Sequence, residues 1–324
     1  MAQAHGHHHH HHPADLGDRR VLGAVLVNLA LTVAQIVGGI LSGSLALIAD
    51  ALHNLSDAVS LVIAFAARRI ARRPSDAGMT FGYVRAEVVA ALVNYTTLIL
   101  IGLYLLWEAW ARFLDPQPIE GWTVVWIAAL ALLVDVVTAW LTFALSKESM
   151  NIRAAFLHNV ADALGSVGVI VAGVLVILYG WWIVDPIVTA MISAYILWHA
   201  ISEIGGAIRI LMLGAPEGVE TGEVVDALRA ADGVRDLHHV HLWQIDESKL
   251  ALEAHLVVDP GAGMDRADAV KARVKAMLAE RFGIGHATLE LERPGDACGE
   301  AETIGHDAER DREEDPGRDP AHAH

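Results

Sequence analysis

The stretch LALIADALHNLSDAVSLVIAFAA, residues 45–67, is apolar over nearly its whole length and yet contains three ionisable side chains. At about 1.5 Å of rise per residue, a helix of this length crosses the roughly 30 Å hydrocarbon core of a bilayer. Ionisable groups inside a membrane span are costly, so those that are present are candidates for function. The stretch therefore predicts a membrane-spanning helix that holds polar chemistry within the bilayer.

Five further stretches have the length and apolar character of a membrane span: residues 21–42, 86–110, 122–145, 154–179 and 183–204. The whole chain is 54% hydrophobic, and its mean hydropathy of +0.41 is above that of soluble domains. We therefore expect a membrane domain of six helices over residues 21–213. Six crossings return the chain to its starting side.

Basic residues gather on one side of these spans, although the net charge of the 324-residue chain is −16. They precede the first span, follow the second, fourth and sixth spans, and comprise Arg19, Arg20, Arg68, Arg69, Arg72, Arg73, Arg85, Lys147, Arg153 and Arg209. The loops on the other side contain almost no basic residue except Arg112. By the positive-inside tendency, both termini are expected in the cytoplasm.

Two pairs of ionisable residues with the same spacing lie inside the spans. His53 and Asp57 are four residues apart in the second span, and His158 and Asp162 repeat this spacing in the fifth. Residues four apart lie on one face of a helix, so two such helices can form a tetrahedral zinc site. Mg²⁺ and Ca²⁺ prefer oxygen ligands and Cu(I) prefers thiolates. The alternative is a structural His–Asp hydrogen bond in each pair.

Asp50 and Asn54 share a stripe of the second span with His53 and Asp57. We interpret them as outer groups that orient the ligands or admit the ion. A purely structural role is the alternative for both residues.

At these residues the sequence resembles the cation diffusion facilitators, specifically their bacterial zinc, cadmium and cobalt resistance branch. The matching stretches are SGSLALIADALHNLSD (42–57), FGYVRAE (81–87), LHNVADALGS (157–166) and the pair Asp185-Pro186, within a resemblance that covers residues 20–293. The resemblance implies a homodimer in the bacterial cytoplasmic (inner) membrane. It further implies that the two-histidine, two-aspartate site exports zinc in exchange for protons, with cadmium and cobalt as further substrates.

One loop departs from the family pattern. Some members bind a second metal ion between the second and third spans through an aspartate and two histidines. Here the loop holds Asp76, with Met79 and Tyr83 at the two histidine positions. We therefore expect this site to be absent or weak and Asp76 to be merely solvated. Members that carry manganese tend to have aspartates in place of the central histidines, so manganese is disfavoured.

Residues 214–294 predict a small α+β domain of ferredoxin-like αββαβ order. The expected elements are a helix at 221–231, strands at 237–245 and 250–258, a helix at 265–281 and a strand at 287–291. Alternation along the first strand predicts His239 and His241 on one face and His238 on the other.

By the same resemblance, this domain is a cytoplasmic sensor of zinc. The family's metal-binding positions match His238, His255 and Glu290, with Glu292, His241 and His286 as further candidates. Binding there is expected to draw the two cytoplasmic domains of the dimer together.

The two ends of the chain differ in character. The leader, residues 1–20, contains six consecutive histidines and is either a natural metal-gathering segment or an expression tag. The tail, residues 295–324, has ten acidic and three basic residues and is expected to be disordered. The only cysteine, Cys298, excludes an intrachain disulfide and any multi-cysteine metal cluster.

The sequence thus favours a zinc exporter, with no enzyme activity and no nucleic-acid partner expected. The chain contains no phosphate-binding loop, which argues against an ATP-driven pump. Two alternatives are a membrane-anchored metal sensor or buffer and a passive metal channel. Ligands within facing spans favour transport over a buffer, and a dehydrated four-ligand site binds too tightly for rapid conduction.

Overall fold

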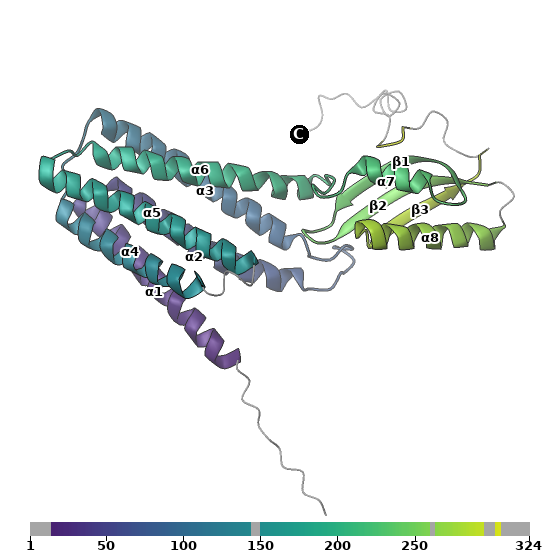
Figure 1. Ribbon diagram of the computed structural model, residues 1–324, viewed down its shortest axis with the longest axis horizontal. Helices are drawn as coiled ribbons and strands as arrows, with labels where there is room; N and C mark the ends of the chain where they lie inside the picture. Colours follow the sequence, from purple (N-terminus) through teal and green to yellow (C-terminus); the bar gives the residue numbers. More distant parts are fainter. Residues whose placement is uncertain (1–13, 144–149, 260–262, 295–301, 306–324) are drawn as a thin grey trace, which may run out of the picture. The chain divides into compact units, whose positions relative to one another are not determined.

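The computed structural model describes residues 14–143, 150–259, 263–294 and 302–305 (Figure 1), so most of the histidine-rich leader lies outside the described residues. The elements are α1 (Ala14–Ser42), α2 (Leu45–Ala71), α3 (Ala86–Leu114), α4 (Gly121–Phe143), α5 (Met150–Tyr179), α6 (Val184–Leu211), α7 (Thr221–Arg229), β1 (Val234–Gln244), β2 (Leu250–Val258), α8 (Met264–Phe282) and β3 (His286–Glu292). The predicted order of six long helices followed by an αββαβ domain is confirmed.

The long helices have the dimensions of membrane spans. Helices α2, α3 and α6, together with most of α4 and α5, are long and apolar enough to cross a bilayer, and α1 adds the shorter apolar segment Val27–Ser42. A helix pairs its backbone groups internally, which a segment in lipid requires. The helices overlap the predicted spans but several are longer than predicted. Helix α1 begins at Ala14 rather than residue 21, α2 ends at Ala71 rather than 67, and α6 ends at Leu211 rather than 204.

The outside of the helical region exposes many large apolar side chains. Trp140 is 74% exposed, Phe65 71% and Trp107 70%. Such side chains favour aggregation in water but are solvated by lipid tails. The interior combines aliphatic residues with small and polar ones, and its fully buried members include Leu47, Leu105, Ala46, Ala128, Gln35 and Ser193. The polar chemistry is therefore inside the bundle.

Helices α4 and α5 pack side by side through glycine (Figure 1). A Cβ atom added to Gly121 would lie 2.9 Å from the carbonyl oxygen of Gly173, and one added to Gly173 would lie 3.3 Å from that of Gly121. Real Cβ atoms essentially never show a contact as short as the first, and the second would require the neighbouring backbone to shift by a few tenths of an ångström. The two glycines thus set the spacing between these helices.

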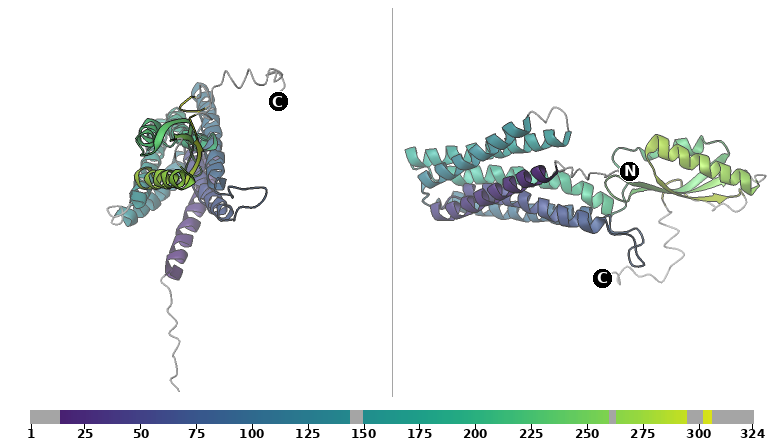
Figure 2. Two further views of the ribbon diagram at one scale, coloured as in Figure 1. Left: turned by 90° about the vertical axis from the view of Figure 1, so that its right-hand side faces the viewer. Right: turned by 90° about the horizontal axis from the view of Figure 1, so that it is seen from below.

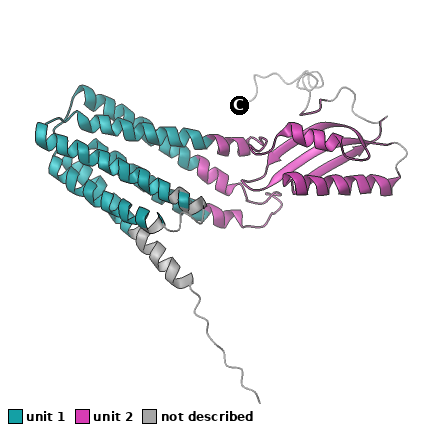
Figure 3. Cartoon of the chain, viewed as in Figure 1, with its two compact units in different colours: residues 1–66, 93–204 teal, residues 67–92, 205–324 magenta. Residues whose placement is uncertain are grey.

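The chain forms two compact units (Figure 3). The first contains residues 1–66 and 93–204, and the second contains residues 67–92 and 205–324. Within the second unit, Val88 of α3 packs with Ala207 and Ile210 of α6. The guanidinium of Arg85 also donates to the carbonyl oxygens of Gln244 and Ile245, at 3.3 and 3.1 Å. The loop before α3 therefore belongs structurally with the small domain.

The small domain is a three-stranded sheet with both helices on one face (Figure 2). Strand β2 is central, antiparallel to β1 and parallel to β3. Leu252, Leu256 and Leu289 point toward α7 and α8 and form the hydrophobic core with Val274 and Leu278 of α8. Successive side chains of a strand alternate between faces, so the intervening residues lie on the open face. The open face carries the candidate ligands.

A β-bulge changes the predicted facing of the β1 histidines. His238 pairs with His255, but His241 pairs with Glu253, so three residues of β1 are matched by two of β2. His239 is the extra residue, and its φ of 50° is left-handed. The prediction that His238 and His241 lie on opposite faces of the strand was therefore wrong. Because of the bulge, both lie on the same face of the sheet as His255.

Part of the tail is ordered, contrary to the predicted disorder of residues 295–324. Ile304 forms a parallel bridge with Val240 at the outer edge of β1. The amide of Val240 donates to the carbonyl oxygen of Thr303, and the amide of Gly305 donates to that of Val240. Unpaired groups at a sheet edge attract a further strand, which explains the contact. The rest of this prediction lies outside the described residues.

Candidate metal centres

The position of α2 is fixed at its first turn. The carboxylate of Asp185, from the start of α6, accepts a 2.8 Å hydrogen bond from the amide of Leu45. It also accepts hydrogen bonds from the amide of Ala46 and the hydroxyl of Ser44. A carboxylate at a helix N-terminus satisfies unpaired amides and complements the helix dipole.

Helices α2 and α5 approach each other where Gly165 faces Asp50. A Cβ atom at Gly165 would lie 3.3 Å from Oδ1 of Asp50, which leaves little room for a larger residue. His53 and Asp162 each lie less than one helical turn from this contact, on α2 and α5 respectively. Their side chains therefore come within reach of each other. The packing of the two helices thus explains why their polar faces meet.

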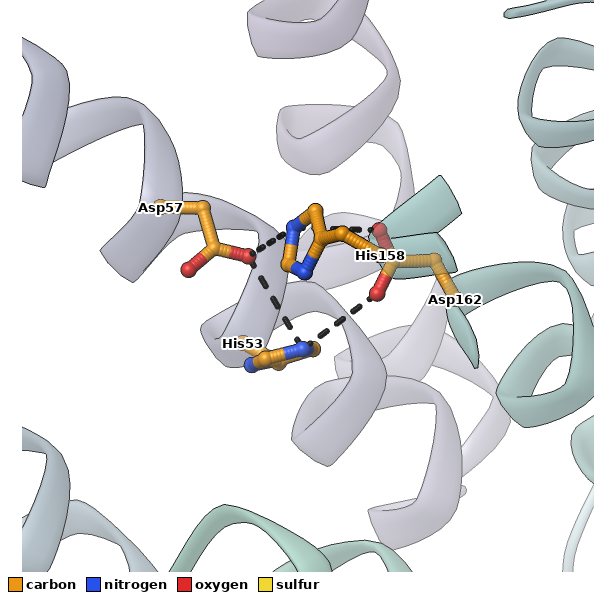
Figure 4. A group of neighbouring side chains, drawn as sticks. All are labelled: His53, Asp57, His158 and Asp162. Atoms are coloured by element: carbon orange, nitrogen blue, oxygen red, sulfur yellow. Dashed lines mark ion pairs between the residues drawn. The ribbon is translucent and has the colours of Figure 1, made fainter. Parts of the chain in front are cut away.

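The four predicted ligands converge on one point (Figure 4). Nε2 of His53 lies 3.3 Å from Oδ1 of Asp162 and 3.8 Å from Oδ2 of Asp57. Nε2 of His158 lies 3.2 Å from Oδ2 of Asp57 and 3.3 Å from Oδ2 of Asp162. A tetrahedral zinc ion with bonds of about 2.0 to 2.2 Å requires ligand atoms about 3.3 to 3.6 Å apart. Asp162 contacts the two histidines through different oxygens and the distance from His53 to Asp57 is longer than this range, so the four side chains are gathered at zinc-binding distance without forming a regular tetrahedron.

Burial leaves several of these ligand atoms without ordinary partners. Oδ2 of Asp57, Oδ1 of Asp162 and Nε2 of His53 are buried and have no hydrogen-bond partner within the described parts of the chain. A buried polar atom without a partner is unfavourable. A cation held between two carboxylates and two imidazole nitrogens satisfies all of them at once, which a single His–Asp hydrogen bond does not.

A cavity of about 530 Å³ reaches the cluster from the side of α1 and α4. Asp57, His158 and Asp162 lie in its wall, and further polar lining comes from Asn28, Asn54, Asp135 and Asn159. His53 is not among the lining residues, and its ring stands edge-on to that of Tyr195 from α6, 6.2 Å between centroids. The cavity gives an ion access to the cluster, and α6 closes the cluster behind His53.

Asp50 and Asn54 are linked to each other through α1. Nε2 of Gln35 donates a 2.6 Å hydrogen bond to Oδ2 of Asp50, and Nδ2 of Asn54 donates to Oε1 of Gln35 at 3.3 Å. All three side chains are buried. Gln35 and Tyr195 were not selected as site residues from the sequence. The signal available for Gln35 was an amide side chain within an otherwise apolar span, whereas a tyrosine in a span carries none.

A second cluster lies on the open face of the small domain's sheet. Nε2 of His238 lies 3.2 Å from Oε2 of Glu292, and Nδ1 of His255 lies 2.7 Å from Oε1 of the same carboxylate. Ligand atoms of these three residues lie within 4.8 Å of one another. His238 and Glu292 are buried although they face away from the core. The arrangement offers three ligands of the types that zinc prefers.

The other predicted candidates of this domain are placed less favourably. Oε2 of Glu290 lies 3.5 Å from Nε2 of His255, so it borders the cluster on its exposed side. His241 lies beside Glu253 and lines a different pocket with Trp243. His286 is exposed at the first position of β3. His241 and His286 are not part of the cluster.

The loop before α3 is organised by Asp76, which was wrongly expected to be merely solvated. Oδ1 of Asp76 accepts hydrogen bonds from the amides of Gly78 and Met79, at 2.8 and 2.9 Å. Oδ2 accepts one from the hydroxyl of Tyr83 at 2.7 Å. The Tyr83 hydroxyl, followed by the two amides, lowers the pKa of Asp76 below its ordinary value. Both carboxylate oxygens thus brace the loop.

Comparison with known proteins identifies the family. The model of the cation efflux transmembrane domain matches residues 21–212, and that of the cation efflux protein's cytoplasmic domain matches residues 216–294. The zinc transporter ZitB of Pectobacterium atrosepticum is 38% identical over 90% of this chain and 89% of its own length. ZitB of Escherichia coli is 37% identical over 90% and 93%. The cadmium, cobalt and zinc/H(+)-K(+) antiporter of Bacillus subtilis is 34% identical over 80% and 84%. The chain therefore belongs to the cation diffusion facilitators, a family of membrane transporters for metal cation efflux.

Proposed function

We propose that this transporter exports zinc across the bacterial inner membrane in exchange for protons, with His53, Asp57, His158 and Asp162 as the transport ligands. The observation that carries the proposal is the set of distances between these four side chains, 3.2 to 3.8 Å. Three of these distances lie within about 0.1 Å of the edge range of a zinc tetrahedron, about 3.3 to 3.6 Å, and the fourth, from His53 to Asp57, is longer. Zinc is the substrate, and cadmium and cobalt are secondary substrates.

Proton exchange follows from the chemistry of the ligands. An imidazole nitrogen holds either a proton or a metal ion, so protons compete directly with zinc at His53 and His158. If the cluster is open alternately to the two sides of the membrane, protons from the more acidic side displace zinc there. Loss of those protons on the cytoplasmic side restores the ligands. The polar cavity lined by Asn54 and Asp135 supports access from one side.

The small domain is proposed as the cytoplasmic part of a homodimer, with both chain termini in the cytoplasm. His238, His255 and Glu292 would hold a regulatory zinc ion there, and Glu290 is close enough to His255 to join them. We assign residues 21–213 to transport and residues 214–294 to dimerisation and metal sensing. The excess of basic residues on the side of this domain supports its cytoplasmic orientation.

The proposal is tested by zinc-driven proton flux in proteoliposomes under an imposed pH gradient. Intact protein should show saturable flux that depends on the gradient. Asp57→Asn and Asp162→Asn keep the size of each side chain but remove its charge, and each should reduce flux to background. Asp115→Asn makes the same change in the exposed loop after α3 and should leave flux unchanged.

Other results would select the alternatives. Tight zinc binding without flux under any gradient would contradict export and identify a membrane-anchored sensor or buffer. Flux that rises linearly with zinc and ignores the proton gradient would identify a channel. Full flux in both aspartate variants would move the transport site away from α2 and α5.

A further inference from the structure

A short segment of the tail crosses the edge of β1 beside the cytoplasmic cluster. We call this segment, Glu302–Gly305, the strap. Its carbonyl oxygens at Glu302 and Thr303 accept hydrogen bonds from the amides of His239 and Val240, at 3.1 and 3.0 Å. The amide of Gly305 donates to Val240 at 3.3 Å. The strap is therefore held as a short additional strand, the mode in which an extended segment binds an exposed sheet edge.

The strap is also bound by side chains. Nδ1 of His239 lies 3.1 Å from the carbonyl oxygen of Gly305. Because a carbonyl oxygen can only accept, Nδ1 of His239 carries the hydrogen of this bond. The guanidinium of Arg229, from α7, reaches the hydroxyl of Thr303 at 3.4 Å. The imidazole of His239 is thus oriented from one side by the strap.

The other side of the same imidazole contacts the metal cluster. The ring of His239 is edge-on to that of His238 at 5.2 Å and to that of His255 at 5.0 Å, measured between centroids. The rings of His238 and His255 are 5.1 Å apart. The three imidazoles therefore form one packed group, of which two are candidate zinc ligands and the third holds the strap.

The backbone at this point is specialised for the arrangement. The left-handed φ of 50° at His239 is uncommon for a residue other than glycine and accompanies the bulge in β1. Without the extra residue, strict alternation would place the ring at this position on the opposite face of the strand. The bulge is what allows one residue to face the strap with its amide and the cluster with its ring.

We propose that docking of the strap on β1 is coupled to zinc binding at the His238–His255–Glu292 cluster, with His239 as the positioning residue between them. This inference rests on the cytoplasmic zinc site proposed above. Coordination fixes the rings of His238 and His255, and thereby the surface against which His239 packs. Zinc should therefore favour the docked strap. Because coupling between two sites is reciprocal, the docked strap should raise the affinity for zinc by the same factor.

The test uses the full chain carrying Asp57→Ala and Asp162→Ala, which removes the membrane site. The same chain with His238→Ala is the reference, because the histidine-rich leader can also bind zinc and only the difference between the two reports on the cytoplasmic cluster. Amide hydrogen exchange is followed by mass spectrometry in peptides that contain Val240 and Gly305. Zinc should slow exchange in both peptides by about fivefold or more, the lower end of usual coupling between sites. Two truncated forms are then compared: a chain that ends at Gly299 lacks the strap, and a chain that ends at His306 keeps it. The shorter chain should bind zinc at least about fivefold more weakly.

A point variant separates coupling from simple folding. His239→Asn keeps a side chain that tolerates left-handed backbone and can donate a hydrogen bond, but it removes the ring. In this variant the metal-free exchange of Val240 and Gly305 should remain close to that of the parent, and zinc should no longer slow it. His286→Ala, which changes an exposed histidine of the same domain, should preserve the full effect of zinc.

The possible failures are distinguishable. If zinc binds with His238-dependent affinity but leaves exchange at Val240 and Gly305 unchanged, the coupling is wrong and the cytoplasmic site stands. If His238→Ala does not alter zinc binding, the proposed cytoplasmic site is wrong, and the coupling is overturned with it. If Val240 exchanges equally fast in the two truncated chains without metal, the strap itself does not dock.

Discussion

The amide of Leu45 donates a 2.8 Å hydrogen bond to Oδ2 of Asp185, so a carboxylate from α6 holds the first turn of α2. Asp185 is buried and also accepts hydrogen bonds from Ser44 and Ala46. Asp185→Ala leaves these donors without an acceptor, and each buried unsatisfied group costs about 1 to 3 kcal/mol. We expect a clear fall in the thermal midpoint of unfolding in detergent. Asp115→Ala, in an exposed loop, should leave that midpoint unchanged.

The side chain of Gln35 should contribute to stability mainly through its hydrogen bonds to Asp50 and Asn54, and less through the space it fills. Gln35→Leu has a similar size but removes the donor to Asp50 and the acceptor for Asn54. We expect a loss of about 1 to 3 kcal/mol in the free energy of unfolding. Zinc flux should also fall, because Asn54 lines the cavity that reaches the four proposed transport ligands. Gln35→Glu keeps an acceptor for Asn54 but brings a second carboxylate to Asp50. Normal stability and flux in the leucine variant would contradict a role for this network.

Glycine spacing between α4 and α5 gives a third prediction. Gly121→Ala places a Cβ atom 2.9 Å from the backbone of Gly173, which cannot move aside as a side chain can. We expect the two helices to separate and the protein to lose about 1 to 3 kcal/mol of stability, as overpacked sites do. Gly206→Ala in α6 meets open space and should be neutral or stabilising by about 0.5 to 1 kcal/mol. Equal stabilities of the two variants would refute this account.

The loop before α3 offers a prediction about pH and metal. Because hydrogen bonds lower the pKa of Asp76 in the folded chain, its carboxylate stabilises the loop above the ordinary pKa of an aspartate. That contribution is lost as the pH falls through the lowered value. Tyr83→Phe removes the first of these bonds and should raise the pKa of Asp76 toward normal, as read by carboxyl NMR. Because no metal site is expected in this loop, Asp76→Asn should bind as many zinc ions per chain as the unaltered protein. If this variant binds one zinc ion fewer, the loop does hold a metal site.

The sequence was sufficient for the architecture and for the shared facing of the four proposed transport ligands. Long apolar runs predict the spans because a helix in lipid has no other way to pair its backbone. The four-residue spacing within His53/Asp57 and His158/Asp162 predicts the two ligand faces, since side chains at that spacing overlie each other. We also expected these two faces to meet. The physical basis for this comes only from the structure, in the close approach of Gly165 to Asp50.

Other features had no signal in the sequence that could be read locally. The bulge at His239 inserts one residue into the alternation of β1. The sequence around it is compatible with the alternation both with and without this extra residue. The bracing of Asp76 depends on a turn that brings Tyr83 back to it. Docking of Ile304 depends on an edge of β1 formed more than fifty residues earlier in the chain. Each of these is a consequence of three-dimensional proximity between segments that local patterns treat separately.

The open face of the sheet has a consequence for how the domain can change over time. His238, His255, Glu290 and Glu292 project from the same strands as the leucines of the core, but toward the opposite side. Substitutions among these proposed ligands therefore leave the leucine side of the sheet in place, so the domain can keep its fold whichever ion it would bind. Metal preference and fold are thus free to diverge independently, and new ion selectivities can be selected on an unaltered scaffold.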